Sequence, residues 1–186
     1  MEKIISYILA GGKSRRLGVN KLHVRVGGQS LLERTIATCN TCFTQVKIVA
    51  GSREELSAFD CEVILDSPLA RGPMAGVIAA LEDYQSDQCF ITAADLPDLS
   101  SHIIKSLMAR YLDQQYLGIV ETNGLQPLCG IYHLSSLDVL KRAARCGEYS
   151  LNRTMQFLNH SGICPPGDQW RNINYPQDLA VGDIHV

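Results

Sequence analysis

The sequence predicts an α/β protein in which a mostly parallel sheet lies between two layers of helices. Short, almost continuously apolar runs rich in β-branched residues alternate with segments of helical character. Uninterrupted apolar runs of this length are typical of strands that are buried on both faces. Glycine or acidic residues follow several runs directly, and open α/β sheets bind their ligands at these strand ends.

The first part of the chain predicts the alternating elements of such a sheet. The expected strands are Ile4–Leu9, a short piece at His23–Val26, Val46–Val49, Val63–Leu65 and Cys89–Thr92. The expected helices are Leu31–Cys39, Glu54–Phe59, Met74–Tyr84 and a segment from Ser100 or Ser101 to about Leu112. Ser30 and Glu33 have the capping-box spacing, which places the start of the first helix at Leu31.

The second part of the chain is less regular and predicts an antiparallel portion. Leu117–Val120 and Cys129–Tyr132 are expected strands, joined through the hairpin signal Asn123-Gly124. Ser135 with Asp138 predicts the start of a further helix. Because we find no repeat, low-complexity stretch or linker, residues 1–186 are expected to form a single domain.

Composition and charge exclude several classes of protein. Seventeen basic and nineteen acidic residues give a net charge of −2, so the basic excess that is typical of nucleic-acid binding is absent. No apolar run reaches the roughly 18 residues that a membrane span requires, and the first residues lack a signal-peptide layout.

Seven cysteines, an odd number, favour a reduced, cytoplasmic protein. Cys39 and Cys42 form a C-x-x-C pair, which is interpreted as partly buried thiols near a helix end because a second pair for zinc is missing.

A glycine-rich loop after the first strand predicts an anion site. Gly11 and Gly12 allow backbone amides to approach a ligand closely. Fixed positive charge follows at Arg15, Arg16 and Lys21, so a triphosphate is the expected ligand. The loop is no Walker motif, because Tyr7 stands where a glycine is needed, and a basic, solvated loop is the alternative.

Two aspartates end neighbouring strands. Asp95 follows the strand Cys89–Thr92, where a carboxylate is a natural Mg²⁺ ligand; an ordinary turn aspartate before Pro97 is the alternative. Asp66 ends the preceding strand. The small residues from Gly72 to Gly76 would allow a helix start to lie close to a ligand, and Arg71 beside them is either a phosphate contact or a solvated arginine.

The glycine loop resembles the signature of a known family. Leu9-Ala10-Gly11-Gly12-x-Ser14-x-Arg16-Leu17-Gly18, followed by Lys21, is similar to L-A-G-G-x-S-x-R-M-G-x-D-K of the molybdenum cofactor guanylyltransferases. This family belongs to the nucleotidyltransferases with a Rossmann-like, three-layer α/β/α fold. The resemblance implies that the nucleotide is bound by Leu9, Ala10, Gly11, Gly12 and Lys21. Gly11 favours GTP, because relatives that use CTP read L-A-A-G; Asn20 departs from the signature by replacing its aspartate.

Further segments match the family in the same order along the chain. Asp95-Leu96-Pro97 resembles its D-[ML]-P motif, which implies that Asp95 binds Mg²⁺ and nucleotide, and the resemblance also implies nucleotide contact for Asp66. Gln126 in Gln-Pro-Leu is implied to line the acceptor side, with a plain strand entry as the alternative. Asn172 and Asn174 lie in a segment similar to N-[IV]-N-T-P-x-D-L, with Tyr175 replacing the threonine. Residues at i and i+2 of an extended chain point the same way, toward the metal or the acceptor phosphate.

The resemblance implies an Mg²⁺-dependent transfer of GMP from GTP to the phosphate of molybdopterin. Asp95 would hold the metal, while Arg16 and Lys21 would stabilise the phosphates. Besides GTP and molybdopterin, the expected partners are molybdoenzymes or other cofactor-biosynthesis proteins in transient contact. Two alternatives stay open at this point. One is an enzyme of the same fold that uses CTP or a sugar 1-phosphate. The other is a non-catalytic nucleotide- or cofactor-binding homologue, which the departures at Asn20 and Tyr175 would fit.

Overall fold

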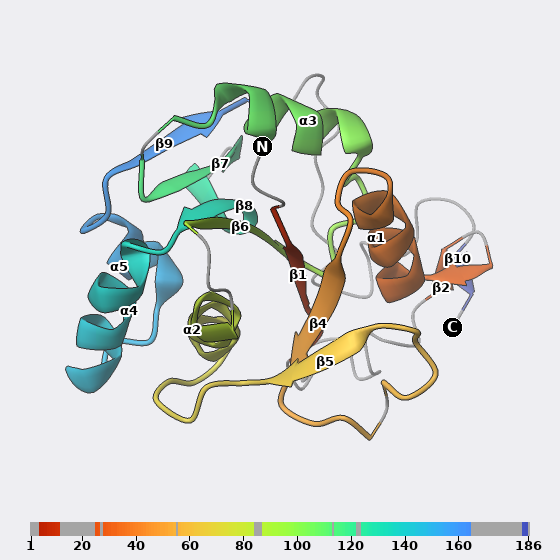
Figure 1. The fold of residues 1–186 in the computed structure, drawn as a ribbon, viewed down its shortest axis with the longest axis horizontal. Coiled ribbons are helices and arrows are strands. Elements are labelled where there is room, and N and C mark those ends of the chain that lie inside the picture. Colours follow the sequence, from red (N-terminus) through yellow and green to blue (C-terminus); the bar gives the residue numbers. More distant parts are fainter. Residues whose placement is uncertain are drawn as a thin grey trace.

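The computed structural model describes residues 4–11, 25–26, 28–54, 56–83, 87–112, 114–121, 124–164 and 184–185. Within them a seven-stranded sheet has the order β5-β4-β1-β6-β8-β7-β9 (Figure 1). Its strands are β1 (Ser6–Leu9), β4 (Val46–Ala50), β5 (Glu62–Leu65), β6 (Gln88–Ala93), β7 (Tyr116–Glu121), β8 (Gly124–His133) and β9 (His160–Ile163). A smaller sheet contains β2 (Arg25–Val26), β3 (Gln29–Ser30) and β10 (Ile184–His185), in the order β10-β2-β3, so the last described residues pair with β2.

The order of the strands reverses at β1. The chain passes from β1 to β4 and β5 on one side, and then returns to place β6 on the other side of β1; these four strands are parallel. β8 is antiparallel to both β6 and β7. Such a reversal leaves a crevice beyond the carboxyl ends of the strands, where α/β proteins bind ligands.

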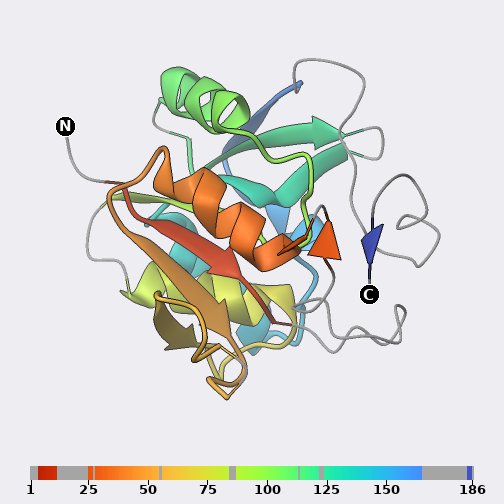
Figure 2. The same cartoon turned by 90° about the vertical axis from the view of Figure 1, so that its right-hand side faces the viewer.

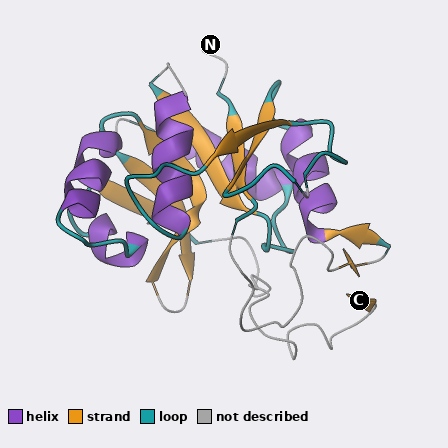
Figure 3. Ribbon diagram, turned by 90° about the horizontal axis from the view of Figure 1, so that it is seen from below, coloured by secondary structure: helices purple, strands orange, loops and turns teal. Residues whose placement is uncertain are grey.

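Helices cover both faces of the sheet (Figures 1 and 3). Their bounds are α1 Leu31–Asn40, α2 Pro73–Asp83, α3 Ser101–Arg110, α4 Ser136–Arg145 and α5 Leu151–Met155. α1 and α3 pack on one face through Leu32, Ile104 and Leu107, and the other helices contribute Ile78, Leu140 and Met155 to the opposite face. Figure 2 shows α1 and α2 on the two sides of β1. The α/β/α class expected from the sequence is therefore confirmed.

Local sequence explains where helices begin. Glu33 N–H donates to Ser30 Oγ at 3.1 Å, and Ser30 N–H donates to Glu33 Oε2 at 2.6 Å, so the predicted capping box of α1 is confirmed. Ser100 caps α3 by a single hydrogen bond, because Ile103 N–H donates to Ser100 Oγ at 3.4 Å. The helix predicted from Ser135 and Asp138 is confirmed as α4, with Ser135 as its N-cap residue. The Ser135 hydroxyl makes no cap hydrogen bond, because it lies 2.8 Å from His133 Nδ1 instead.

The main error of the sequence prediction is the helix at Glu54–Phe59. The structure has turns there, with Leu56 N–H donating to Arg53 O and Phe59 N–H to Leu56 O. Bonds of this i to i+3 type close single turns, and the described residues of the segment do not continue into an α-helix. The elements α5 and β9 were not predicted, whereas the hairpin of β7 and β8 is confirmed. In the described part of the chain, no helix has the length and apolar character to cross a membrane.

Candidate active site

Three sequence-predicted segments meet at the carboxyl edge of the sheet. β1 ends at Leu9 and is followed by Ala10 and Gly11, while Asp66 directly follows β5 and Asp95 lies two residues after β6. Ala94 N–H donates to Leu9 O at 3.1 Å, which ties the residue before Asp95 to the end of β1. Asp66 N–H donates to Ala50 O at 2.9 Å at the end of β4. The strand reversal thus brings these segments together although they are distant in sequence.

The Asp66 carboxylate is surrounded by glycine backbones from three elements. A methyl group on Gly11 or on Gly51 would lie 3.5 Å from Asp66 Oδ2, and one on Gly76 would lie 3.3 Å from Oδ1. The Gly76 methyl would also come within 2.9 Å of the Leu9 side chain. Glycine at position 76 therefore lets the first turns of α2 lie directly against β1 and Asp66. Side chains at these positions would cover the carboxylate.

Burial raises the pKa of the Asp66 carboxyl above its usual value. The partly desolvated acid therefore gains from a ligand that donates hydrogen bonds to it. Carboxyl groups with raised pKa values are frequent at functional sites.

Asp95 is half-buried on an anchored loop. Leu96 and Leu99, which follow Asp95 in this loop, are buried in the core, and Leu99 N–H donates to Leu96 O at 3.2 Å. A carboxylate is the hard oxygen donor that Mg²⁺ prefers. Among the described residues, no group of three or more His, Cys, Asp or Glu side chains could hold a metal. A site with Asp95 as protein ligand fits Mg²⁺, which commonly takes its other ligands from phosphate and water.

Gln126 lies at the same edge from the antiparallel side. Cys129 of β8 pairs with Thr92 of β6, so the residues just before Cys129 run beside those that follow Thr92. Gln126 Oε1 accepts a hydrogen bond from Leu128 N–H at 3.1 Å. The other predicted site residues, Gly12, Arg16, Lys21, Asn172 and Asn174, lie outside the described residues.

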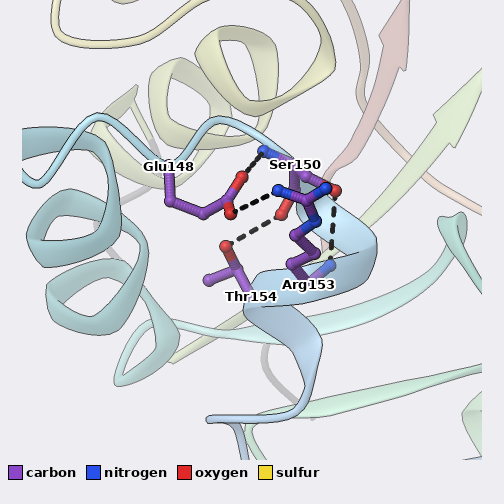
Figure 4. A network of polar contacts seen from close by, with 4 residues as sticks. All are labelled: Glu148, Ser150, Arg153 and Thr154. Carbon is purple, nitrogen blue, oxygen red and sulfur yellow. Dashed lines mark hydrogen bonds and ion pairs between the residues drawn. The ribbon is translucent and has the colours of Figure 1, made fainter.

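Arg71 contacts an aromatic ring as well as solvent. Its guanidinium carbon lies 5.8 Å from the centre of the Tyr149 ring, within the range of a cation–π contact. Tyr149 lies in the connection between α4 and α5, which a polar network braces (Figure 4). Glu148 accepts from Ser150 N–H at 2.8 Å and pairs with Arg153 at 3.3 Å, while Thr154 Oγ1 donates to Ser150 O.

The C-x-x-C pair lies at the end of α1, as expected. Cys39 is buried and Cys42 is half-buried. Burial raises the pKa of the Cys39 thiol to about 12, so the reactive thiolate form is disfavoured at neutral pH.

Gly51 is the site residue that sequence analysis missed. It follows β4 directly and lies against Asp66, as Gly11 does. The sequence contained the signal for it, because Gly51 follows a buried apolar strand and ligands of α/β proteins bind beyond the carboxyl ends of the strands.

Comparisons with known proteins bear on the family and the fold of the chain. Residues 6–161 match the family model of the MobA-like NTP transferase domain. A Pyrococcus horikoshii protein named probable molybdenum cofactor guanylyltransferase is 31% identical over 193 residues, covering 96% of this chain and 98% of that protein. An Aquifex aeolicus protein of the same name is 26% identical over 176 residues, covering 93% and 87%.

A solved structure has the same fold. The crystal structure of molybdopterin-guanine dinucleotide biosynthesis protein A from Archaeoglobus fulgidus superposes with a TM-score of 0.80 at 24% identity, covering 94% of each chain. The match of the family model over most of the sequence, together with the relative from Pyrococcus horikoshii, shows that the chain belongs to the MobA-like NTP transferase family.

Proposed function

We propose that the protein transfers GMP from GTP to the phosphate of molybdopterin, forming molybdopterin guanine dinucleotide and releasing pyrophosphate. The observation that carries this proposal is the convergence of the ends of β1, β5 and β6 at the strand reversal. This convergence places the glycine backbone that a nucleotide would contact beside two carboxylates, Asp66 and Asp95, which follow different strands. The names of the relatives in Pyrococcus horikoshii and Aquifex aeolicus support the choice of reaction.

The proposed roles follow from position. Leu9, Ala10, Gly11, Gly12, Lys21, Asp66 and Asp95 would contact the nucleotide, and Gln126, Asn172 and Asn174 would face the acceptor. Asp95 would hold Mg²⁺, which when bound neutralises charge on the phosphate oxygens. Arg16 and Lys21 would stabilise the triphosphate and the departing pyrophosphate.

The reaction requires no protein nucleophile. An oxygen of the molybdopterin phosphate attacks the α-phosphorus of GTP in line, a new O–P bond forms, and the bond to the β-phosphate oxygen breaks as pyrophosphate leaves. A phosphate monoester has a second pKa near 6, so the attacking group is largely ionised at neutral pH without a general base. Positioning of two anions and neutralisation of their charge therefore dominate the rate.

The direct test is pyrophosphate release from purified protein with GTP, Mg²⁺ and molybdopterin, with CTP, UTP and ATP in parallel. We expect release with GTP and formation of the guanine dinucleotide. Release with CTP instead, or with a sugar 1-phosphate as acceptor, would establish another enzyme of this fold. No release with any pair, from protein that binds nucleotide, would establish a binding protein.

Asp95→Ala tests the metal assignment. We expect turnover to fall at least ~100-fold with the fold retained, because several kcal/mol of charge stabilisation at the phosphates would be lost. The matched control is Asp87→Ala, an exposed aspartate just before β6 at the opposite end of the strand. Equal turnover in the two variants would remove Asp95 from the metal site.

A further inference from the structure

An irregular segment of β8 lies next to Gln126, on the side of the site where the acceptor is proposed to bind. β7 and β8 pair in register from Tyr116 with Tyr132 to Gly118 with Gly130, and the next pair is Ile119 with Gln126. Residues 127–129 of β8 therefore have no counterpart on β7, and the strand bulges there. Because Cys129 pairs with Thr92, the bulge runs beside the end of β6 and the turn that carries Asp95.

Two tyrosine hydroxyls bind the backbone of this bulge. Tyr116 Oη donates to Gln126 O and also lies 3.3 Å from Cys129 O. Tyr132 Oη donates to Pro127 O at 2.8 Å. A bulge takes carbonyl groups out of the regular ladder, and buried carbonyls need partners. The tyrosines supply those partners, so the shape of the bulge depends on the side chains of the regular part of the hairpin.

Paired glycines make room for this arrangement. Tyr116 and Gly118 share one face of β7, and Gly118 faces Gly130 across the ladder. A methyl group on Gly118 would overlap the Tyr116 hydroxyl, and one on Gly130 would come within 2.6 Å of it. The Tyr116 ring therefore leans along the strand over two positions without side chains.

Both tyrosines are fully buried, and their ring centres are 4.4 Å apart. Burial raises the pKa of Tyr132, so its hydroxyl keeps its proton and stays a donor at neutral pH. Phenylalanine would fill the same apolar space without the hydroxyl. The hydroxyls are thus explained by the bulge rather than by packing.

We propose that Tyr116 and Tyr132 are positioning residues that hold residues 126–128 against the end of β6 and thereby set how the phosphorylated acceptor meets the nucleotide. This inference rests on the proposed function, in which Gln126 faces the acceptor. The pair acts through the bulge, so it affects the acceptor more than GTP, which is expected at the ends of β1 and β5.

The test uses Tyr116→Phe and Tyr132→Phe in the full chain, with Tyr7→Phe as matched control. Tyr7 is an equally buried tyrosine whose hydroxyl donates to Asp83 Oδ2 at 2.7 Å, away from the site. Steady-state kinetics would be measured with GTP and molybdopterin varied separately. Loss of one neutral hydrogen bond is expected to raise the KM for molybdopterin about three- to tenfold, with the KM for GTP changed less than about twofold.

A second measurement does not depend on activity. Hydrogen exchange of the Leu128 amide, which donates to Gln126 Oε1, reports directly on the bulge. We expect about three- to tenfold faster exchange in both bulge variants and no change in Tyr7→Phe. If one of the two variants fails to fold, the other carries the same test.

The outcomes separate the two proposals. A wild-type protein that releases no pyrophosphate with molybdopterin would end the proposed function, and the acceptor role of the tyrosines with it. An active wild type whose bulge variants change both KM values equally, or leave the Leu128 amide exchange as it was, would overturn the positioning role alone.

Discussion

At the scale of a single residue, Asp66 shows that a ligand site can lower the stability of the free protein. Its carboxylate lies between the backbones of Gly11, Gly51 and Gly76, and burial raises the pKa of this acid. An ionised acid that has lost part of its hydration destabilises the free protein. Such a position is maintained where a ligand compensates for the loss, which agrees with the nucleotide contact proposed for Asp66.

Asp66→Asn is therefore expected to stabilise the free protein while it weakens GTP binding. The native state binds the proton more tightly than the unfolded chain, so the wild type loses stability as pH rises from the unfolded pKa through the folded one. At pH 7 the variant should gain on the order of 0.5–1 kcal/mol in unfolding free energy, and the gain should vanish toward acidic pH. Urea unfolding at pH 7 and pH 4 measures this; a variant less stable than wild type at pH 7 would contradict it.

At the scale of elements, one buried lysine joins the strands to α2. Lys47 Nζ lies 2.8 Å from Asp83 Oδ2 and 3.1 Å from Glu62 Oε2, and Tyr7 donates to the same Asp83 oxygen. These contacts connect β4, β5, α2 and β1. Burial alone would lower the pKa of Lys47, but its hydrogen bonds to Asp83 and Glu62 outweigh burial and raise the pKa. The network therefore stabilises the fold below the ordinary lysine pKa and loses this effect as pH rises through the raised value.

Lys47→Met should destabilise the protein by about 2–3 kcal/mol, because it leaves Asp83 partly buried without its cation. The matched control is Lys141→Met. It breaks the ion pair with Glu82, the residue before Asp83, in which Lys141 Nζ lies 2.8 Å from Glu82 Oε1. That pair is more exposed, so its loss should cost less than about 1 kcal/mol. Urea denaturation of both variants gives the comparison, and equal losses would show that Lys47 contributes no more than a surface ion pair.

At the scale of the whole molecule, the proposed nucleotide would join strand ends from both sides of the reversal at β1. A ligand that binds only the folded state stabilises it by about 2.7 kcal/mol at 100 times its Kd. For a chain of 186 residues this corresponds to a rise in Tm of roughly 5–10 °C.

Thermal unfolding with Mg²⁺ and each nucleoside triphosphate at equal concentration checks this expectation. GTP should give the largest rise in Tm, and the rise should shrink in Asp66→Asn. An equal or larger rise with CTP would contradict the preference for GTP that Gly11 predicts.

Local pattern was sufficient for the elements whose signals are local. The capping box at Ser30 and Glu33, the apolar run of β1 and the hairpin of β7 and β8 follow from neighbours in sequence. The helix expected at Glu54–Phe59 was wrong. Its apolar residues fit a short helix and a series of turns packed against the core equally well. Pattern alone does not separate the two for so short a segment.

The sequence by itself determined the class of fold, the family resemblance and the aspartates at the strand ends, since each depends on residue types at short spacing. Only the tertiary structure decided which segments share an edge: that Gly51 and Gly76 enclose Asp66, and that Tyr116 binds the carbonyl of Gln126. The physical reason is that strand order and register are set by packing between residues far apart in the chain. A carboxylate's burial or a hydroxyl's partner therefore exists only once the sheet has formed.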